Sequence, residues 1–303
     1  MLTYDQYVLA QSLNEVFDIL DAKPASRILA GATDILPWAR YGRAGDVHLS
    51  SVIDVSRVPE LKYIQLNGSN IGFGANTTIA DFQHNPILRK HAPVLSQCAV
   101  WFADDQIREQ ATVAGNVVNA SPAGDSQPAL LSLNTVIKLI RREQGKIVER
   151  TMPLLEFILG PSKTRLAEKE LVLGFECDSI LNYGSAYEKV GHRRSLVIST
   201  VCMAVVAKVA QAKGSIEDIR IGIGAVGPVP KRLYALEKRL MTQSITSQLI
   251  REIAEDASDE VQSRSRQEYR REVLVNFVER AIVSALNQAG MKLTRVGEEK
   301  LYA

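Results

Sequence analysis

Two short stretches of small residues constrain this chain more than any other feature of its sequence. The first is Ala30-Gly31-Ala32-Thr33-Asp34, directly after the apolar Ile28-Leu29. The second is Thr112-Val113-Ala114-Gly115-Asn116, followed shortly by Ala120-Ser121-Pro122-Ala123-Gly124-Asp125. Small side chains let the backbone approach a bulky ligand, and free N–H groups in such a loop can point at an anion. Either stretch alone is equally typical of a plain turn, but two of them could clamp the two phosphates of a dinucleotide.

Length and composition exclude several classes of protein. A chain of 303 residues can bury a large core and predicts two domains. Its net charge of +2 provides no basic field for nucleic acid. No apolar window is long enough for a membrane span, and the start, Met1-Leu2-Thr3-Tyr4, lacks the order of a secretory signal. We therefore expect a cytoplasmic protein with no nucleic-acid partner.

The sequence predicts no metal site and no catalytic residue of its own. The cysteines Cys98, Cys177 and Cys202 form no CxxC pair, which argues against a cluster or structural zinc held by this chain alone. The four histidines show no ligand spacing, and no nucleophile stands beside a base. Buried thiols are the simpler expectation for the cysteines.

Apolar periodicity predicts a small α/β lobe and then a larger α+β lobe. In the first, strands at 4–9, 27–30 and 52–55 alternate with helices that open at Ser12 and Ile35. Ser12 and Glu15 resemble a capping box. The larger lobe begins with a hairpin over 63–74 that turns at Asn67-Gly68. Further elements are expected in this order: helices from 78, over 91–102 and over 127–133, and strands at 135–140 and 146–148.

A third region is predicted to form a separate α+β domain. Strands are expected at 170–176, 185–190, 199–210 and 216–225, and a charged helical segment follows from 245. In that segment Arg264, Arg266, Arg270 and Arg271 crowd around one tyrosine. Both a solvated helix face and a contact surface explain this cluster.

One conventional nucleotide motif is present but stands in the wrong context. Gly222-Ile223-Gly224-Ala225-Val226-Gly227 matches GxGxxG after a predicted strand. A nicotinamide-dependent dehydrogenase needs a helix to start there, and Pro228 and Pro230 oppose one. The motif is therefore predicted to be a turn between a strand and a helix.

The ordered set of motifs resembles the FAD-binding medium subunit of the molybdenum hydroxylases, the family that includes carbon monoxide dehydrogenase and xanthine dehydrogenase flavoprotein subunits. The family's AGGTD, T-(I/V)-GGN and ASPAGD motifs stand here as residues 30–34, 112–116 and 120–125. Later landmarks match at 157–161, 186–190 and 265–271, so the resemblance covers nearly the whole chain. It implies an α+β fold with a two-lobed FAD-binding domain over 1–168 (lobes about 1–56 and 57–168) and an α+β C-terminal domain over 169–303.

The resemblance also implies roles for particular residues. The FAD pyrophosphate would be wrapped on one side by Leu29, Ala30, Gly31, Ala32, Thr33, Asp34 and Ile35. It would be held on the other side by Thr112, Val113, Ala114, Gly115 and Asn116. Asp125 would bind ribityl or ribose hydroxyls, and Phe102 would lie near the flavin or adenine. Lys189 is a further candidate, although a lysine on a strand is commonly a solvated side chain.

By the same resemblance, the chain would be an electron-transfer flavoprotein oxidoreductase subunit. It would take electrons from the iron–sulfur clusters of a (2Fe-2S) small subunit and pass them to NAD, oxygen or a quinone. A molybdopterin-binding large subunit would complete a heterotrimer, usually doubled. Two family glycines are replaced here by Ala32 and Ala114. If either position needs a positive φ, FAD binding weakens, and a non-catalytic assembly subunit with weak or lost FAD becomes the alternative.

Overall fold

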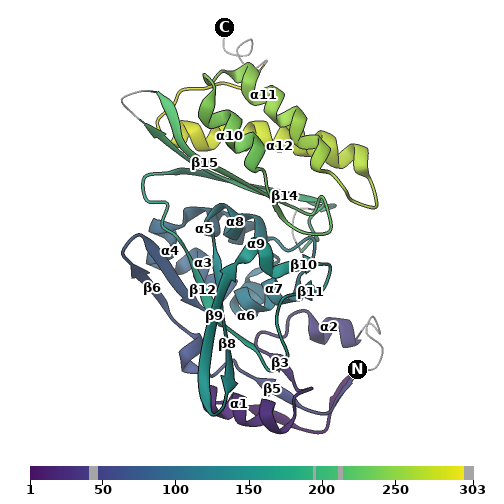
Figure 1. Cartoon of the computed structure of the whole chain (residues 1–303). Coiled ribbons are helices and arrows are strands. Elements are labelled where there is room, and N and C mark those ends of the chain that lie inside the picture. The colour runs from purple at the N-terminus through teal and green to yellow at the C-terminus, as the bar shows by residue number, and fades with distance from the viewer. Residues whose placement is uncertain (41–46, 194–195, 211–213, 297–303) are drawn as a thin grey trace.

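The computed structural model describes residues 1–40, 47–193, 196–210 and 214–296. Three parts follow one another along its length (Figure 1): a small N-terminal lobe, a central part of helices and a long sheet, and a C-terminal sheet covered by helices. This arrangement confirms the predicted α+β class.

The N-terminal lobe is built on a three-stranded parallel sheet in the order β2-β5-β3. Its elements are β1 (Leu2–Tyr4), β2 (Tyr7–Leu9), α1 (Leu13–Ala22), β3 (Arg27–Leu29), α2 (Ile35–Arg40), β4 (Val47–Leu49) and β5 (Val52–Asp54). The strand expected over 4–9 is in fact two strands, because β1 leaves to pair with β4. Ser12 caps α1, but Glu15 accepts from the N–H of Gln11, so the capping box is incomplete.

The central part contains a five-stranded antiparallel sheet in the order β6-β7-β12-β8-β9. Its strands are β6 (Ile64–Asn67), β7 (Asn70–Gly74), β8 (Val136–Glu143), β9 (Lys146–Pro153) and β12 (Leu171–Asp178). The hairpin turns at Gly68 and Ser69, one residue later than expected, since Asn67 pairs with Asn70. The predicted boundary at residue 168 would assign β12 to the C-terminal domain, although β12 is the middle strand of this sheet. We propose to place the boundary after β12.

Short helices cover this sheet and form most of the main core with it. They are η1 (Pro59–Leu61), α3 (Ile79–His84), α4 (Pro86–His91), α5 (Pro93–Trp101), α6 (Asp105–Gln110), α7 (Val113–Asn119), α8 (Ser126–Ser132) and α9 (Leu154–Phe157). Two short strands, β10 (Ile158–Gly160) and β11 (Lys163–Thr164), follow them. The helix expected from residue 78 is α3, and Thr78 caps it in a complete capping box with Asp81.

The C-terminal part is a four-stranded antiparallel sheet in the order β13-β14-β15-β16. Its elements are β13 (Gly184–Val190), β14 (Val201–Ala210), β15 (Ser215–Gly224), β16 (Lys231–Arg232), α10 (Tyr234–Thr242), α11 (Ser247–Asp256), η2 (Ala257–Glu260) and α12 (Gln267–Gln288). Helices α10 to α12 cover one face (Figure 1), and α5 and α8 pack on the other. Within the described ranges, no helix is long and apolar enough to cross a membrane.

The GxGxxG motif has a packing role in this sheet. No helix begins there, because a turn leads from β15 into β16 before α10 starts. A Cβ on Gly222 would lie 2.3 Å from the carbonyl oxygen of Pro128. These glycines therefore let β15 pack closely on α8, and the motif is not a nicotinamide site.

Candidate anion-binding loop and buried carboxylate

The first predicted loop lies where a parallel strand ends. Residues 30–34 follow β3 at the carboxyl edge of the parallel sheet, the edge at which open α/β sheets bind ligands. The backbone N–H groups of residues 31–35 donate to no acceptor in the part of the chain that the structure describes. Ala32 has a left-handed backbone with a φ of 54°. A left-handed residue within a short loop turns successive N–H groups towards one side, and such a concavity binds anions.

The structure brings the two small-residue stretches together. A Cβ on Gly31 would lie 1.9 Å from the carbonyl oxygen of Gln110, so the first loop touches the backbone just before the second stretch. The amide of Asn119 donates to the carboxylate of Asp34 at 2.7 Å. Glycine is therefore required at position 31, because any side chain would separate the two stretches.

The second stretch is the start of a helix and not a loop. Thr112 caps α7, and its hydroxyl oxygen accepts from the N–H of Gly115 at 3.1 Å. The N–H of Val113 donates to Thr77 at 2.9 Å. Its first-turn N–H groups thus have acceptors already. What this stretch can offer a ligand is the hydroxyl hydrogen of Thr112 and the amide nitrogen of Asn116, whose oxygen accepts from Ser126 at 2.7 Å.

The two departures from the family pattern differ in backbone geometry. Ala32 has a positive φ, a conformation that glycine adopts without strain. Ala114 lies inside α7 and has no positive φ. Only Ala32 therefore meets the condition under which the sequence predicts weaker FAD binding.

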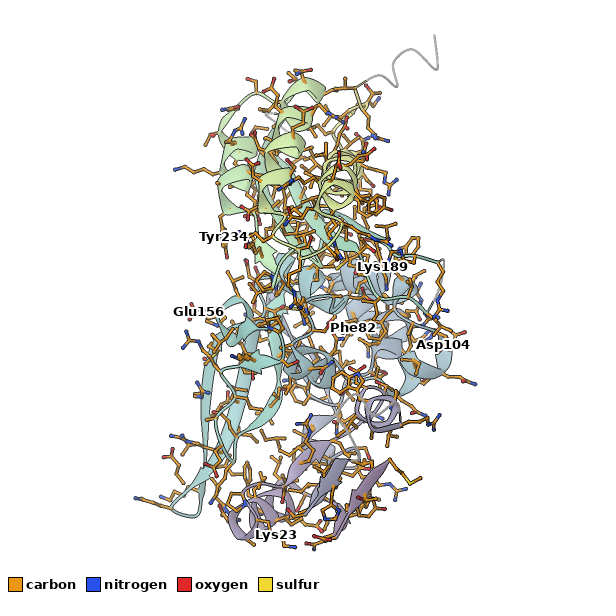
Figure 2. All side chains as sticks on the ribbon, turned by 90° about the vertical axis from the view of Figure 1, so that its right-hand side faces the viewer. Lys23, Phe82, Asp104, Glu156, Lys189 and Tyr234 are labelled. Carbon is orange, nitrogen blue, oxygen red and sulfur yellow. The ribbon has the colours of Figure 1, made fainter. Side chains whose placement is uncertain are left out.

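Asp125 and Lys189 form a buried ion pair between the central and C-terminal parts. The Lys189 ammonium lies 2.7 Å from one carboxylate oxygen of Asp125, and the Ser199 hydroxyl donates to the other at 2.5 Å. Lys189 is only 7% exposed, so the alternative of a solvated side chain is wrong. Figure 2 shows it at the junction of the two parts. Burial raises the pKa of Asp125, while the charge and hydrogen bond of Lys189 oppose that rise.

Phe102 and two residues that sequence reasoning missed complete the surroundings. Phe102 ends α5 and is nearly buried, and its neighbour Trp101 accepts from Lys189 at 3.0 Å. Ser199 has no motif that predicts its contact with Asp125. Thr77 has a buried hydroxyl without a hydrogen-bond partner among the described residues, beside the start of α7. An unpaired buried hydroxyl is unfavourable in itself and is available to a ligand.

The residues of the first loop therefore fit a phosphate-bearing cofactor. The loop presents unpaired N–H groups, and the neighbouring helix adds a hydroxyl and an amide. The three cysteines are buried, and burial raises the pKa of the Cys98 thiol well above its ordinary value. Among the described residues no cluster of histidine, cysteine or acidic side chains could hold a metal ion.

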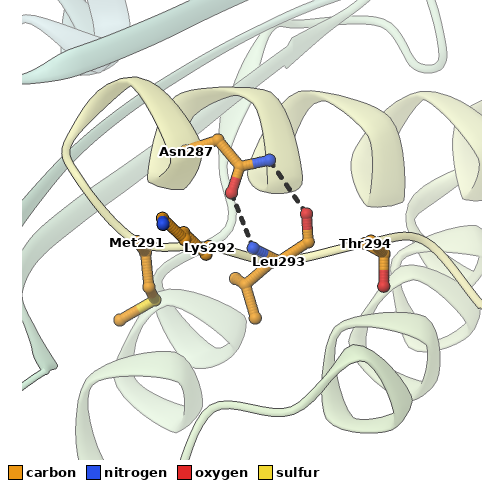
Figure 3. Close-up of a pocket in the computed structure, with 5 residues that line it drawn as sticks. All are labelled: Asn287, Met291, Lys292, Leu293 and Thr294. Carbon is orange, nitrogen blue, oxygen red and sulfur yellow. Dashed lines mark hydrogen bonds between the residues drawn. The ribbon is translucent and has the colours of Figure 1, made fainter.

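A separate depression lies at the end of α12, away from these loops (Figures 1 and 3). Its volume is about 450 Å³. The side chain of Asn287 closes it by accepting from the N–H of Leu293 at 2.8 Å and donating to its carbonyl at 2.9 Å. These two hydrogen bonds hold the segment after α12 against the helix, so Asn287 has a structural role.

Comparison with known proteins finds relatives along most of the chain. The chain is 29% identical over 273 residues to the glyceraldehyde dehydrogenase medium chain of Sulfolobus acidocaldarius, covering 88% of this chain and 93% of that protein. It is 27% identical over 300 residues to the putative xanthine dehydrogenase FAD-binding subunit XdhB of Escherichia coli, covering 97% and 100%.

A solved structure shares the fold over nearly the full length. This is the carbon monoxide dehydrogenase of Hydrogenophaga pseudoflava that lacks the Mo-pyranopterin moiety of the molybdenum cofactor. The match has a TM-score of 0.85 and 26% identity, and covers 93% of this chain and 97% of that chain. The family described as the FAD binding domain in molybdopterin dehydrogenase matches residues 3–177, and the CO dehydrogenase flavoprotein C-terminal domain matches 185–285. The chain belongs to the FAD-binding medium subunits of the molybdenum hydroxylases, which are oxidoreductase flavoprotein subunits.

Proposed function

We propose that this chain transfers electrons through an FAD whose diphosphate is held by residues 29–35 on one side and 112–116 on the other. The observation that carries the proposal is the run of unpaired N–H groups at residues 31–35, which faces no acceptor among the described residues. Each hydrogen bond from such a donor to a charged phosphate oxygen contributes about 1.5–3 kcal/mol. Several together favour a diphosphate over a neutral ligand.

The chain's own residues bind and orient the cofactor. The N–H groups at 31–35 would neutralise phosphate charge, and the Thr112 hydroxyl and Asn116 amide would fix the other side. Phe102 would border the flavin or adenine. When bound, FAD supplies the redox chemistry, and the protein supplies position and electrostatics.

Asp125 would accept from a ribityl or ribose hydroxyl of the cofactor. Both of its carboxylate oxygens already accept, from Lys189 and from Ser199. A carboxylate oxygen can accept more than one hydrogen bond, so a cofactor hydroxyl could still donate to it. The buried pair would hold that carboxylate in place for such a contact.

The electron route and the partners belong to the same proposal. Electrons would arrive from the iron–sulfur clusters of a (2Fe-2S) small subunit, after chemistry at a molybdopterin-binding large subunit. They would leave to NAD, oxygen or a quinone. The relatives' names support such an assembly, since they include medium chains and a dehydrogenase complex subunit. We propose a dimer of heterotrimers in the cytoplasm.

Absorbance of the purified chain tests the proposal. After incubation with FAD and removal of free cofactor, we expect flavin bands in the visible region and a stoichiometry near one FAD per chain. A chain that stays colourless under excess FAD would contradict the proposal.

Size-exclusion chromatography of the protein from its native source tests the partners. Co-elution with a molybdenum-containing and an iron–sulfur subunit is expected. Elution of a lone monomer would contradict the assembly.

The alternative, an assembly subunit with weak or lost FAD, is favoured by one observation, the positive φ of Ala32. The co-elution and FAD-uptake experiments together distinguish the two functions. Co-elution with the partners together with failure to take up FAD would support the alternative, whereas co-elution with bound FAD would reject it.

A further inference from the structure

A second site of a different kind lies between the central and C-terminal parts. A cavity of about 610 Å³ is bordered by Pro122, Ala123 and Pro161 of the central part. Ser199, Arg264 and Arg270 of the C-terminal part also border it. Cavities of about 300–1,000 Å³ are typical of small-molecule sites. The volume is therefore sufficient for a ligand of mononucleotide size.

The charge of Arg270 at this cavity has no balancing acid. Its guanidinium is half-buried and donates to the backbone carbonyls of Ser265 (3.1 Å), Thr200 and Ala225. No carboxylate forms an ion pair with it in the described ranges. Burial, followed by the charge of Arg266, lowers the pKa of Arg270. The half-buried Arg270 guanidinium therefore borders the cavity without an acidic side chain to balance its charge.

Two neighbouring arginines increase the positive charge. Arg264 borders the cavity and Arg266 follows it by two residues, and both are exposed without an ion pair to any described residue. Arg266 instead contacts the ring of His192 at 3.1 Å, and the nearby Glu268 pairs with none of the three. Elsewhere in the molecule an arginine does pair with acids, as Arg142 does with Asp18 and Asp21.

The other walls suit a flat organic group. Three prolines, Pro122, Pro161 and Pro228, and the exposed Ile198 provide apolar surface. The hydroxyls of Ser263 and Ser265 add hydrogen-bonding groups beside the arginines. Guanidinium groups recognise phosphate by paired hydrogen bonds. Apolar surface in the same cavity as two arginines suits a base that carries a phosphate.

We propose that this cavity binds a phosphate-bearing nucleotide, with Arg264 and Arg270 on its phosphates. The site is separate from the N–H groups at residues 31–35, and the inference does not depend on the proposed cofactor function. Because Ser199 borders the cavity and donates to Asp125, a nucleotide bound here would lie next to the buried pair.

Calorimetric titration with ADP tests the proposal on the full chain saturated with FAD, so that ADP cannot occupy the FAD site. We expect one ADP per chain, and an affinity at least tenfold lower for Arg264→Ala. Arg264→Glu should abolish binding. Arg271→Ala is the matched control, since Arg271 is an exposed arginine near the start of α12, has no ion pair with any described residue and does not border the cavity. This variant should bind ADP as the wild type does.

Two further probes identify what is recognised. Pyrophosphate should bind with the same dependence on Arg264, and adenosine should bind much more weakly than ADP. Equal affinity of wild type and Arg264→Ala for ADP would overturn the inference, as would adenosine binding as tightly as ADP. Flavin absorbance of the same samples separates the two proposals. FAD uptake without ADP binding refutes this site alone. ADP binding that is lost in Arg264→Ala, in a chain that takes up no FAD, refutes the cofactor function alone.

Discussion

Gly31 is the residue at which the two small-residue stretches touch. We predict that Gly31→Ala lowers the free energy of unfolding by about 2 kcal/mol. The added Cβ would overlap the backbone carbonyl of Gln110, and one of the two backbone segments would have to move. FAD uptake should fall with it. Urea denaturation and flavin absorbance measure the two effects.

Gly160→Ala is the control for this prediction. Gly160 lacks a positive φ, and a Cβ there would meet no atom within 4 Å among the described residues. Its stability should change by less than about 0.5 kcal/mol. A Gly31→Ala variant as stable as Gly160→Ala would contradict the contact.

Ala32 and Ala114 both replace glycines of the family pattern, but they should respond oppositely to glycine. Ala32→Gly relieves a left-handed alanine and should raise the free energy of unfolding, by up to about 1 kcal/mol. Ala114→Gly places glycine within a helix and should lower it by about 1 kcal/mol. Urea denaturation of the two variants side by side decides this, and a shift of both in the same direction would refute the assigned geometry.

At the scale of elements, the pair between Asp125 before α8 and Lys189 on β13 ties the central part to the C-terminal sheet. Lys189→Met should cost about 3–5 kcal/mol at pH 7, because it leaves a buried carboxylate without its cation. The double variant Asp125→Asn/Lys189→Met should lose much less than the two single variants summed. Chemical denaturation of all four proteins gives the coupling.

The same pair gives a pH dependence with a definite sign. Burial raises the folded-state pKa of Asp125, and removal of Lys189 removes the main opposing effect. A carboxyl whose pKa is higher in the folded state binds its proton more tightly there, so folding gains stability as pH falls. Lys189→Met should therefore recover part of its lost stability between pH 7 and pH 4, relative to the wild type. A gap that widens as pH falls would contradict the assignment.

At the scale of the whole molecule, the sequence predicts those features that are determined by residues close together in the chain. The apolar run before Gly31 identifies β3, and the helix expected from residue 78 is α3. The family motifs identify the α+β fold and the cofactor. These features depend on residues a few positions apart.

Other features depend on contacts that local patterns do not contain. The stretch 113–116 is small enough for a loop or a helix, and α7 is favoured by the Thr112 cap and by Thr77, which accepts from Val113. Ser199 reaches Asp125 across 74 residues. Both strand partners of β12, β7 and β8, lie far before it in the chain, which is a contact that local periodicity does not contain, and we propose that the domain boundary lies after β12.

The most direct test of the central claim compares FAD with riboflavin. If the N–H groups at residues 31–35 bind a diphosphate, flavin fluorescence titration of the wild-type chain should show FAD binding at least a hundredfold more tightly than riboflavin, which is about 2.8 kcal/mol. Equal affinity for the two flavins would show that the phosphates contribute nothing and would contradict the account.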